Sequence, residues 1–243
     1  SCIGYRRIRA AKSTATSIGR PNTRRRETAI RTIRRRCCKN GADIQMQYIL
    51  KTPQSFAPDK KYPLIVYLHG AGSRGNTTDV LQNAVIFKYT EREKAFPAII
   101  LAPLCSADTW FDVFEQLLSL VDTVSKLPFV DQNRVSLTGV SMGGYAAYQL
   151  LMSRSGMFSA AVICCGGGMY WNAEKLTGVP VHIYHGAKDD TVYPDESEKM
   201  ANAINRRGGR AALTIFPDLG HNCWETVNND EKVYRFLLSG GEC

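Results

Sequence analysis

Apolar residues follow two periodicities along the chain, and the two alternate from residue 43 onward. Continuous or alternating apolar runs are typical of strands and occupy the ranges 45–51, 62–68, 97–102, 135–140, 158–164, 179–184 and 211–216. Runs typical of helices lie between them, at 79–94, 111–127, 142–152, 195–205 and 227–238. Strands that alternate with helices predict a mostly parallel sheet covered on both faces, a three-layer α/β/α sandwich.

This arrangement predicts where reactive side chains gather. In open α/β sheets, ligands bind beyond the carboxyl ends of the strands. One predicted strand ends near Cys165 and the next begins at Val179, so only a short segment separates them. That segment leaves no room for a large lid, and we expect an open site.

The charge distribution divides the chain into two parts. The 243 residues carry a formal net charge of +9. Thirteen Lys and Arg residues and one acidic residue, Glu27, fall within residues 1–41, whereas the remainder holds 18 basic and 21 acidic residues. We predict a basic arm over residues 1–41 and a mildly acidic domain over residues 42–243, which is long enough to bury a sizeable core.

The arm is expected to be disordered, because it has few large apolar residues to offset the entropy lost on ordering. Three interpretations stay open. The arm is an inert extension, or an organelle transit peptide rich in Arg, Ser and Thr, or a nucleic-acid-binding segment whose clusters at 24–26 and 34–36 attract phosphates. Tyr5 is its one aromatic residue, which disfavours recognition by base stacking.

Cysteine spacing and hydropathy argue against several classes of protein. The eight cysteines form no C-x-x-C pair, so we expect mostly reduced thiols and no metal ion. No apolar run approaches the roughly 20 residues of a transmembrane helix. The N-terminal region lacks the apolar segment of a secretory signal, so we expect a cytoplasmic location, with an organelle as the alternative.

The most informative motif is Gly139-x-Ser141-x-Gly143, between a predicted strand and a predicted helix. It matches the nucleophile elbow, in which a sharp strand-to-helix turn lifts a serine hydroxyl out of the sheet. Glycines two residues to either side remove β-carbons that would collide there. The motif predicts a nucleophilic Ser141, and the alternative is a glycine-rich turn with a surface serine.

A nucleophilic serine needs a histidine base and a carboxylate that orients the base. After an elbow, the chain order is serine, acid, histidine. His221 is the candidate base, because it alone among the four histidines lies on a late, glycine-flanked loop. Asp189 is the first candidate for the acid, and its neighbour Asp190 is the second.

Oxyanion donors are expected from the residue after the nucleophile and from a loop after an earlier strand. Met142 supplies the first N–H. The glycine-rich loop 69–75 supplies the second, with Ala71 as first choice and Gly72 as the alternative. This loop lacks the G-K-[ST] ending of a phosphate cradle, so we discount a phosphate site.

Aromatic residues on the predicted loops form a candidate substrate groove for an aromatic or sugar-linked ester. Together with Gly72, the predicted substrate-binding residues are Trp110, Tyr170, Trp171 and Trp224. The alternative is that some of them pack the loop layer, and Trp224 is expected to brace the loop of His221.

From about residue 43 onward the chain resembles the α/β-hydrolase superfamily. It looks most like the branch of carboxylesterases, dienelactone hydrolases and prolyl-oligopeptidase-like proteins that are often called predicted peptidases or esterases. The stretches that carry the resemblance are, in chain order, 62–72, 102–110, 138–145, 165–168, 185–192 and 220–224.

The resemblance implies a triad of Ser141, Asp189 and His221, with Ala71 and Met142 as oxyanion donors. It implies a feruloyl- or acetyl-esterase-like enzyme that cleaves small-molecule carboxylic esters through an acyl-enzyme and without a cofactor. Two alternatives remain. One is a serine peptidase of prolyl-oligopeptidase type, and the other is a non-catalytic domain tethered to nucleic acid by the basic arm.

Overall fold

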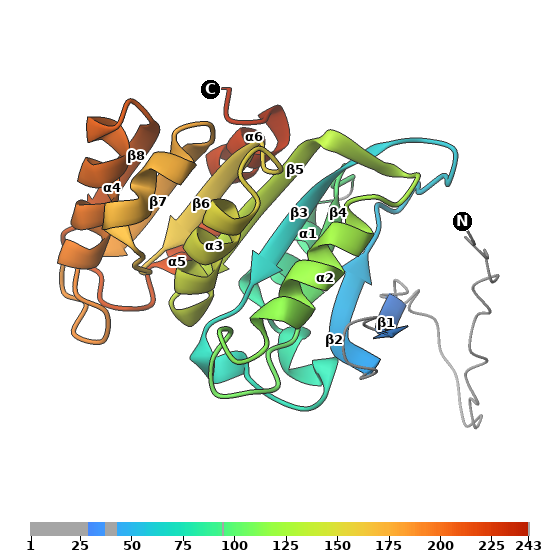
Figure 1. The fold of residues 1–243 in the computed structure, drawn as a ribbon. Helices are drawn as coiled ribbons and strands as arrows, with labels where there is room; N and C mark the ends of the chain where they lie inside the picture. Colours follow the sequence, from blue (N-terminus) through green and yellow to red (C-terminus); the bar gives the residue numbers. More distant parts are fainter. Residues whose placement is uncertain (1–28, 37–42, 94, 243) are drawn as a thin grey trace.

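The computed structural model describes residues 29–36, 43–93 and 95–242, in which eight strands alternate with helices (Figure 1). The strands are β1 (Ala29–Arg36), β2 (Asp43–Lys51), β3 (Tyr62–Leu68), β4 (Ile99–Pro103), β5 (Val130–Val140), β6 (Ala160–Cys164), β7 (Pro180–Gly186) and β8 (Arg210–Phe216). The α-helices are α1 (Val85–Arg92), α2 (Phe114–Val124), α3 (Met142–Ser153), α4 (Asp195–Arg206), α5 (Trp224–Val227) and α6 (Glu231–Ser239). Three 3₁₀ helices are η1 (Ala71–Ser73), η2 (Thr78–Leu81) and η3 (Tyr170–Leu176).

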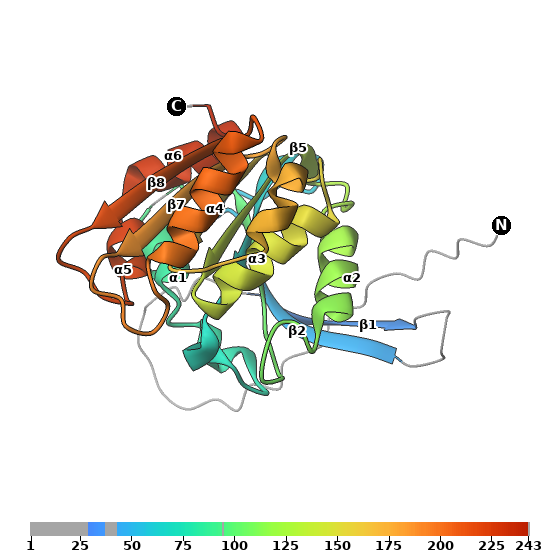
Figure 2. The same cartoon turned by 60° about the vertical axis from the view of Figure 1, so that its left-hand side comes forward.

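The strands form one mostly parallel sheet in the order β1-β2-β4-β3-β5-β6-β7-β8. From β4 to β8 all neighbours are parallel, whereas β2 runs antiparallel to both β1 and β4. The carboxyl ends of six strands therefore meet at one edge of the sheet. Figure 2 shows β8 at one side of the sheet and the β1–β2 pair at the other.

Alternating side chains on the strands feed two separate cores. In β3, Leu64, Val66 and Leu68 pack in one core, while Ile65 and Tyr67 pack in the other. The first core is closed by α2, α3 and α4, and the second by α1, α5 and α6. The two helical layers lie on opposite faces of the sheet (Figure 1). The predicted three-layer α/β/α sandwich is thus confirmed.

Strand β1 differs from the expectation of a disordered arm over residues 1–41. It pairs antiparallel with β2 along its whole length, from Ala29 opposite Leu50 to Arg36 opposite Asp43. An uncovered β2 edge would leave N–H and C=O groups without partners, and Ile30 and Ile33 are β-branched residues that suit a strand. Residues 1–28 and 37–41 lie outside the described residues, and so do the predicted phosphate contacts of the cluster at 24–26.

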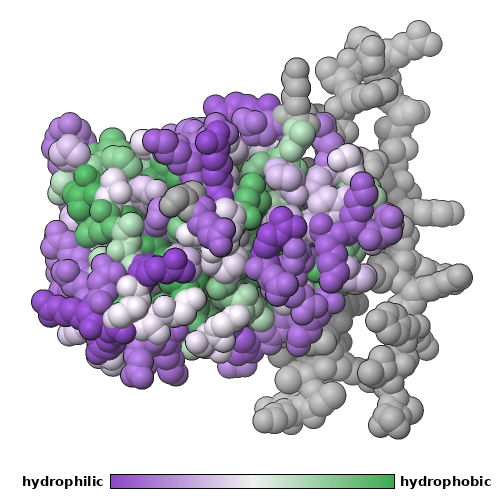
Figure 3. All heavy atoms as spheres, turned by 90° about the horizontal axis from the view of Figure 1, so that it is seen from above, coloured by the Kyte–Doolittle hydropathy of each residue, from purple (hydrophilic) through white to green (hydrophobic). Residues whose placement is uncertain are grey.

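The end of the molecule where the parallel strands begin is shown in Figure 3. Hydrophilic side chains are spread over much of this face, with apolar patches between them. Within the described parts of the chain, no helix combines the length and apolarity that spanning a membrane requires.

Candidate active site

Ser141 lies at the sharp junction between β5 and α3. Its backbone adopts φ 54° and ψ −120°, a conformation that L-residues rarely hold. A β-carbon at Gly139 would lie 2.3 Å from the carbonyl oxygen of Gly143, and one at Gly143 would lie 2.1 Å from that of Leu68. Both glycines of the motif are therefore required by close backbone contacts, as the elbow pattern predicts. The turn holds Ser141 partly exposed at the carboxyl edge of the sheet.

His221 lies within hydrogen-bonding distance of this serine. Its Nε2 is 2.9 Å from Ser141 Oγ, although 80 residues separate the two along the chain. His221 belongs to the loop after β8, and Asp189 belongs to the loop after β7. Two backbone hydrogen bonds join these loops, from Ala187 N to Phe216 O at 2.8 Å and from Lys188 N to Leu219 O at 2.9 Å.

Asp189, rather than Asp190, faces the histidine. Its Oδ2 accepts a hydrogen bond from His221 Nδ1 at 2.7 Å, and its side chain is fully buried. Its Oδ1 accepts from the backbone N–H groups of Thr191 at 3.0 Å and Val192 at 2.9 Å. Asp190 is exposed. The structure thus brings Ser141, His221 and Asp189 into one hydrogen-bonded chain.

The surroundings of Asp189 favour its charged form. Burial by itself would raise the pKa of this carboxyl group, because it disfavours charge. The hydrogen bond from His221, those from the backbone of Val192 and Thr191, and the charge of His221 together outweigh burial, so the pKa is lowered. A carboxylate beside Nδ1 keeps the proton of a neutral imidazole on that nitrogen, which leaves Nε2 free to accept the serine proton.

His185 also contacts Asp189, a role that sequence reasoning missed. Its ring is fully buried, and its Nε2 lies 3.1 Å from Asp189 Oδ2 and 2.8 Å from Val192 O. Both of these oxygens are acceptors, so Nε2 carries a proton. Its Nδ1 lies 2.7 Å from Ser197 Oγ on α4. A histidine four residues before a candidate acid was the available signal.

Both predicted oxyanion donors begin a helical turn. Met142 is the first residue of α3, and Ala71 is the first residue of η1. The first N–H groups of a helix have no acceptor within that helix. The two turns are adjacent, since a β-carbon at Gly70 would lie 3.5 Å from the Cβ of Ser141. This placement is compatible with the predicted roles, which remain a proposal.

Trp110 does not line an open groove. It is fully buried, its Nε1 donates to the backbone oxygen of His69 at 3.0 Å, and its ring centroid lies 4.8 Å from that of His69. His69 in turn accepts from Cys105 N at 3.0 Å through Nε2, and its Nδ1 donates to Gly70 O at 2.7 Å. Burial lowers the pKa of His69 to about 4. Trp110 therefore braces the loop that carries Ala71, because both its indole N–H and its ring contact His69, which precedes that loop.

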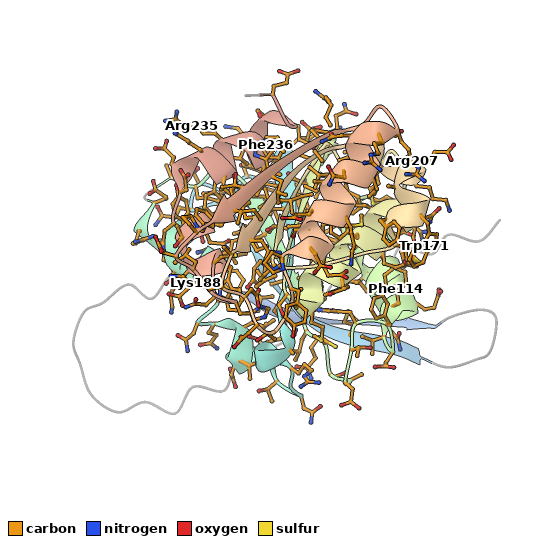
Figure 4. All side chains as sticks on the ribbon, turned by 90° about the vertical axis from the view of Figure 1, so that its left-hand side faces the viewer. Phe114, Trp171, Lys188, Arg207, Arg235 and Phe236 are labelled. Atoms are coloured by element: carbon orange, nitrogen blue, oxygen red, sulfur yellow. The ribbon has the colours of Figure 1, made fainter. Side chains whose placement is uncertain are left out.

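The other predicted substrate residues differ in their surroundings. Trp224 packs edge-on against His221, with ring centroids 5.2 Å apart, as a brace for that loop should. Gly72 is exposed, and a β-carbon there would meet no atom within 4 Å. Tyr170 and Trp171 are exposed and pack edge to face. In Figure 4, Trp171 lies beside Arg207 and well apart from Lys188, the neighbour of Asp189, so substrate contact by Trp171 stays a prediction.

Cys165, directly after β6, lies beneath the three polar side chains. Among the described residues, it and Ser141 are the two non-glycine residues with positive φ, 42° and 54°. Its thiol is hydrogen-bonded with Cys223 and buried, which together raise its pKa, and the backbone N–H of Ser141 also contacts its sulfur. Cys165 begins the stretch 165–168 that carries part of the family resemblance, but the sequence pattern assigned it no role.

Two surface cavities lie elsewhere. One of about 280 Å³ is lined by residues that include Lys51, Phe56 and Phe96. Another of about 480 Å³ is lined by residues that include Lys61 and Arg134. Neither is lined by any residue of the hydrogen-bonded chain, and we place the candidate site at that chain because a partly exposed serine, a histidine and a buried carboxylate meet there.

Comparison with known proteins places the chain in one family and finds esterases and peptidases as relatives. A model described as "Dienelactone hydrolase family" matches residues 79–235. "Probable feruloyl esterase C" of Aspergillus flavus is 29% identical over 193 residues, which cover 76% of this chain and 70% of that protein. "Dipeptidyl-peptidase 5" of Porphyromonas gingivalis is 23% identical over 221 residues, which cover 70% of this chain and 32% of that protein. The chain thus spans about a third of the peptidase's length and about two thirds of the esterase's.

Solved structures agree with this grouping. A thermostable esterase superposes with a TM-score of 0.75 at 26% identity, over 86% of this chain and 62% of the other. Porphyromonas gingivalis dipeptidyl peptidase 4 superposes with a TM-score of 0.63 at 14% identity, over 88% of this chain and 36% of the other. The second match shows the fold alone. Esterases and peptidases of the α/β-hydrolase fold are therefore the structural neighbours.

Proposed function

Because this chain belongs to the dienelactone hydrolase family, we propose that it is a serine hydrolase that cleaves carboxylic esters through Ser141, His221 and Asp189. The single observation that carries the proposal is the continuous hydrogen-bonded chain from Ser141 Oγ through both ring nitrogens of His221 to Asp189 Oδ2, at 2.9 and 2.7 Å. A nucleophile, a base and an orienting acid in this order are the parts that acyl transfer requires.

In the proposed first half-reaction, Ser141 Oγ attacks the ester carbonyl carbon while His221 Nε2 takes the serine proton. The carbonyl oxygen becomes an oxyanion, to which the N–H groups of Ala71 and Met142 donate hydrogen bonds. His221 then passes its proton to the oxygen of the departing alcohol, and the acyl group stays on Ser141. Asp189 holds the ring and stabilises its charged form throughout.

In the second half-reaction, water replaces the alcohol. His221 Nε2 takes a proton from this water, which attacks the acyl carbon, and the same proton returns to Ser141 as the acid leaves. The proposed steps require no metal ion or organic cofactor. The short segment between β6 and β7, which contains η3, leaves the carboxyl edge without a lid domain among the described residues.

Feruloyl esterase relatives support an aromatic or sugar-linked ester as substrate. The Aspergillus flavus relative matches 76% of this chain, and exposed Tyr170 offers an aromatic surface on the loop after β6. A peptidase is the second candidate, because Dipeptidyl-peptidase 5 matches 70% of the chain. We rank it lower, because Dipeptidyl-peptidase 5 is 23% identical to this chain, whereas the feruloyl esterase is 29% identical.

A fluorophosphonate probe and a substrate panel test the proposal. Wild-type protein should be labelled by the probe, Ser141→Ala should not, and Ser153→Ala, at the far end of the same helix, should be labelled like wild type. The panel contains p-nitrophenyl acetate, methyl ferulate, an acetylated sugar and peptide anilides. Labelling that survives in Ser141→Ala would refute the assignment of the nucleophile. Faster cleavage of anilides than of every ester would favour the peptidase.

A further inference from the structure

Three different metal-ligating side chains converge beside the candidate nucleophile. Cys165 Sγ, a carboxylate oxygen of Asp189 and a ring nitrogen of His221 all lie within 4.8 Å of one another. They follow β6, β7 and β8, three adjacent parallel strands, so the topology of the sheet places them at one point of its carboxyl edge. Cys165 and the side chain of Asp189 are fully buried, whereas the side chain of His221 is 21% exposed.

The chemistry of this donor set matches a soft divalent cation. Zinc is bound by thiolate, imidazole and carboxylate, usually with tetrahedral geometry. Bond lengths of about 2.0–2.3 Å place tetrahedral ligand atoms roughly 3.3–3.8 Å apart. The separations here are 4.8 Å or less, and the 2.7 Å between His221 Nδ1 and Asp189 Oδ2 is the shortest given. Shifts of about an ångström in these side chains would therefore complete three of four ligand positions.

We propose that Cys165, Asp189 and His221 form an inhibitory binding site for a thiophilic divalent cation, with Zn²⁺ as the type ion. The fourth position takes water or the Ser141 hydroxyl group. Cys164 is equally buried but is not part of this cluster, so the site depends on one of two adjacent cysteines. The inhibitory effect rests on the proposed function, whereas the binding of the ion does not.

Occupation of the site stops acyl transfer whichever ring nitrogen of His221 binds the ion. An ion on Nδ1 breaks the bond to Asp189 and moves the imidazole proton to Nε2, which can then no longer accept the proton of Ser141. An ion on Nε2 occupies the acceptor directly. Binding releases the thiol proton of Cys165 to solvent, and the charged carboxylate has none to release.

The donor set also sets the selectivity of the site. Mg²⁺ and Ca²⁺ prefer six or more oxygen ligands, and this cluster offers one carboxylate beside sulfur and nitrogen. Thiolate ligands select soft ions instead. We therefore expect Zn²⁺ and Cd²⁺ to inhibit, and Mg²⁺ and Ca²⁺ at the same concentrations to leave the rate unchanged.

Inhibition by Zn²⁺ is measured in paired cysteine variants. Each variant is compared with its own metal-free rate, because Cys165 contacts the backbone of Ser141. Cys165→Ala should raise the inhibition constant for Zn²⁺ about tenfold or more, whereas Cys164→Ala should leave it as in wild type. Equal Zn²⁺ inhibition of wild type and Cys165→Ala, or equal inhibition by Ca²⁺, would overturn the proposal.

Binding is measured separately through the ultraviolet charge-transfer absorbance of a Cd²⁺–thiolate bond. The band should appear in wild type, Cys164→Ala and Ser141→Ala, and should lose one thiolate's contribution in Cys165→Ala. If Cys165→Ala fails to fold, Cys165→Ser takes its place and should show the same loss. A band unchanged by both substitutions would refute the site. Because Ser141→Ala should still bind Cd²⁺, loss of the proposed esterase activity and loss of the metal site are distinguishable.

Discussion

His185 Nε2 lies 3.1 Å from Asp189 Oδ2, the same oxygen that binds His221. Two imidazole rings thus contact one carboxylate oxygen, and a third residue, Ser197, holds the buried ring from its far side. The geometry makes His185 a positioning residue for the acid. It contacts neither Ser141 nor His221 among the hydrogen bonds of the proposed site, so we expect any effect on turnover to pass through Asp189, the proposed acid.

Replacement of His185 should lower kcat with little change in KM. His185→Gln removes the ring that fixes Asp189, and we expect kcat to fall about 10- to 100-fold, as when supporting hydrogen bonds of a site are removed. The matched control is His182→Gln on the same strand, because His182 stacks on Phe236 and lies away from Asp189. Steady-state kinetics on one ester gives kcat and KM for both variants and for wild type. A fall in kcat that is equal in both variants would mean that His185 acts only through stability.

Substitution of Asp189 should lower kcat far more than substitution of its neighbour Asp190. In Asp189→Asn, the side-chain amide donates to Nδ1 and leaves the imidazole proton on Nε2, the wrong nitrogen for a base. We expect kcat to fall about 10⁴-fold, as in the general Ser-His-Asp case. Asp190→Asn, at an exposed position, should stay within about twofold of wild type. The assignment of the acid fails if the two variants lose similar activity.

The elbow should tolerate no side chain at Gly143. A β-carbon there would lie 2.1 Å from the carbonyl oxygen of Leu68, a backbone atom that cannot move without shifting β3. Gly143→Ala should therefore lose about 3 kcal/mol or more of unfolding free energy in urea. Gly72→Ala meets no atom within 4 Å and should unfold like wild type. Matching urea midpoints for the two variants would contradict the close contact.

Acid should destabilise the fold through His69. Burial lowers its pKa to about 4, and Nε2 already accepts a hydrogen bond from Cys105 N, so there is no place for a second proton. Between pH 6.5 and 4, His69 is protonated in the unfolded chain but stays neutral in the folded chain. The free energy of unfolding therefore has its full value above pH 6.5. It decreases by up to about 3 kcal/mol as the pH falls. His69→Gln should show a correspondingly flatter dependence of unfolding free energy on pH, and parallel curves would exclude His69 as the source.

Local sequence patterns were sufficient for the sheet and the elbow. Residues 135–140 alternate as a strand, and the glycines at 139 and 143 mark a turn where two backbones touch, so Ser141 could be located from five residues. Order along the chain then pointed to His221. The choice between Asp189 and Asp190 could not be made locally, because it depends on which carboxylate turns toward a loop 32 residues away.

Other features depend on contacts that no local pattern encodes. His185 acts on Asp189 only because α4 brings Ser197 to its other ring nitrogen. Trp110 was expected in a groove, but its indole N–H reaches the backbone of a loop 41 residues earlier. Strand β1 was not predicted, because the charge density of this segment suggested disorder. The edge of β2 that β1 covers exists only once the sheet has assembled. The proximity of Cys165 to Asp189 and His221 becomes visible only when three strand ends are placed together.

Two backbone hydrogen bonds tie the loop of Asp189 to the loop of His221, from Ala187 to Phe216 and from Lys188 to Leu219. Asp189 and His221, the proposed acid and base, are thus held by two joined loops, while Ser141, the proposed nucleophile, lies at the start of a separate helix. Thermal motion or a change in solvent should loosen the spacing between Ser141 and His221 before it disturbs the spacing between His221 and Asp189. On heating, turnover would then be lost in molecules in which His221 and Asp189 are still hydrogen-bonded.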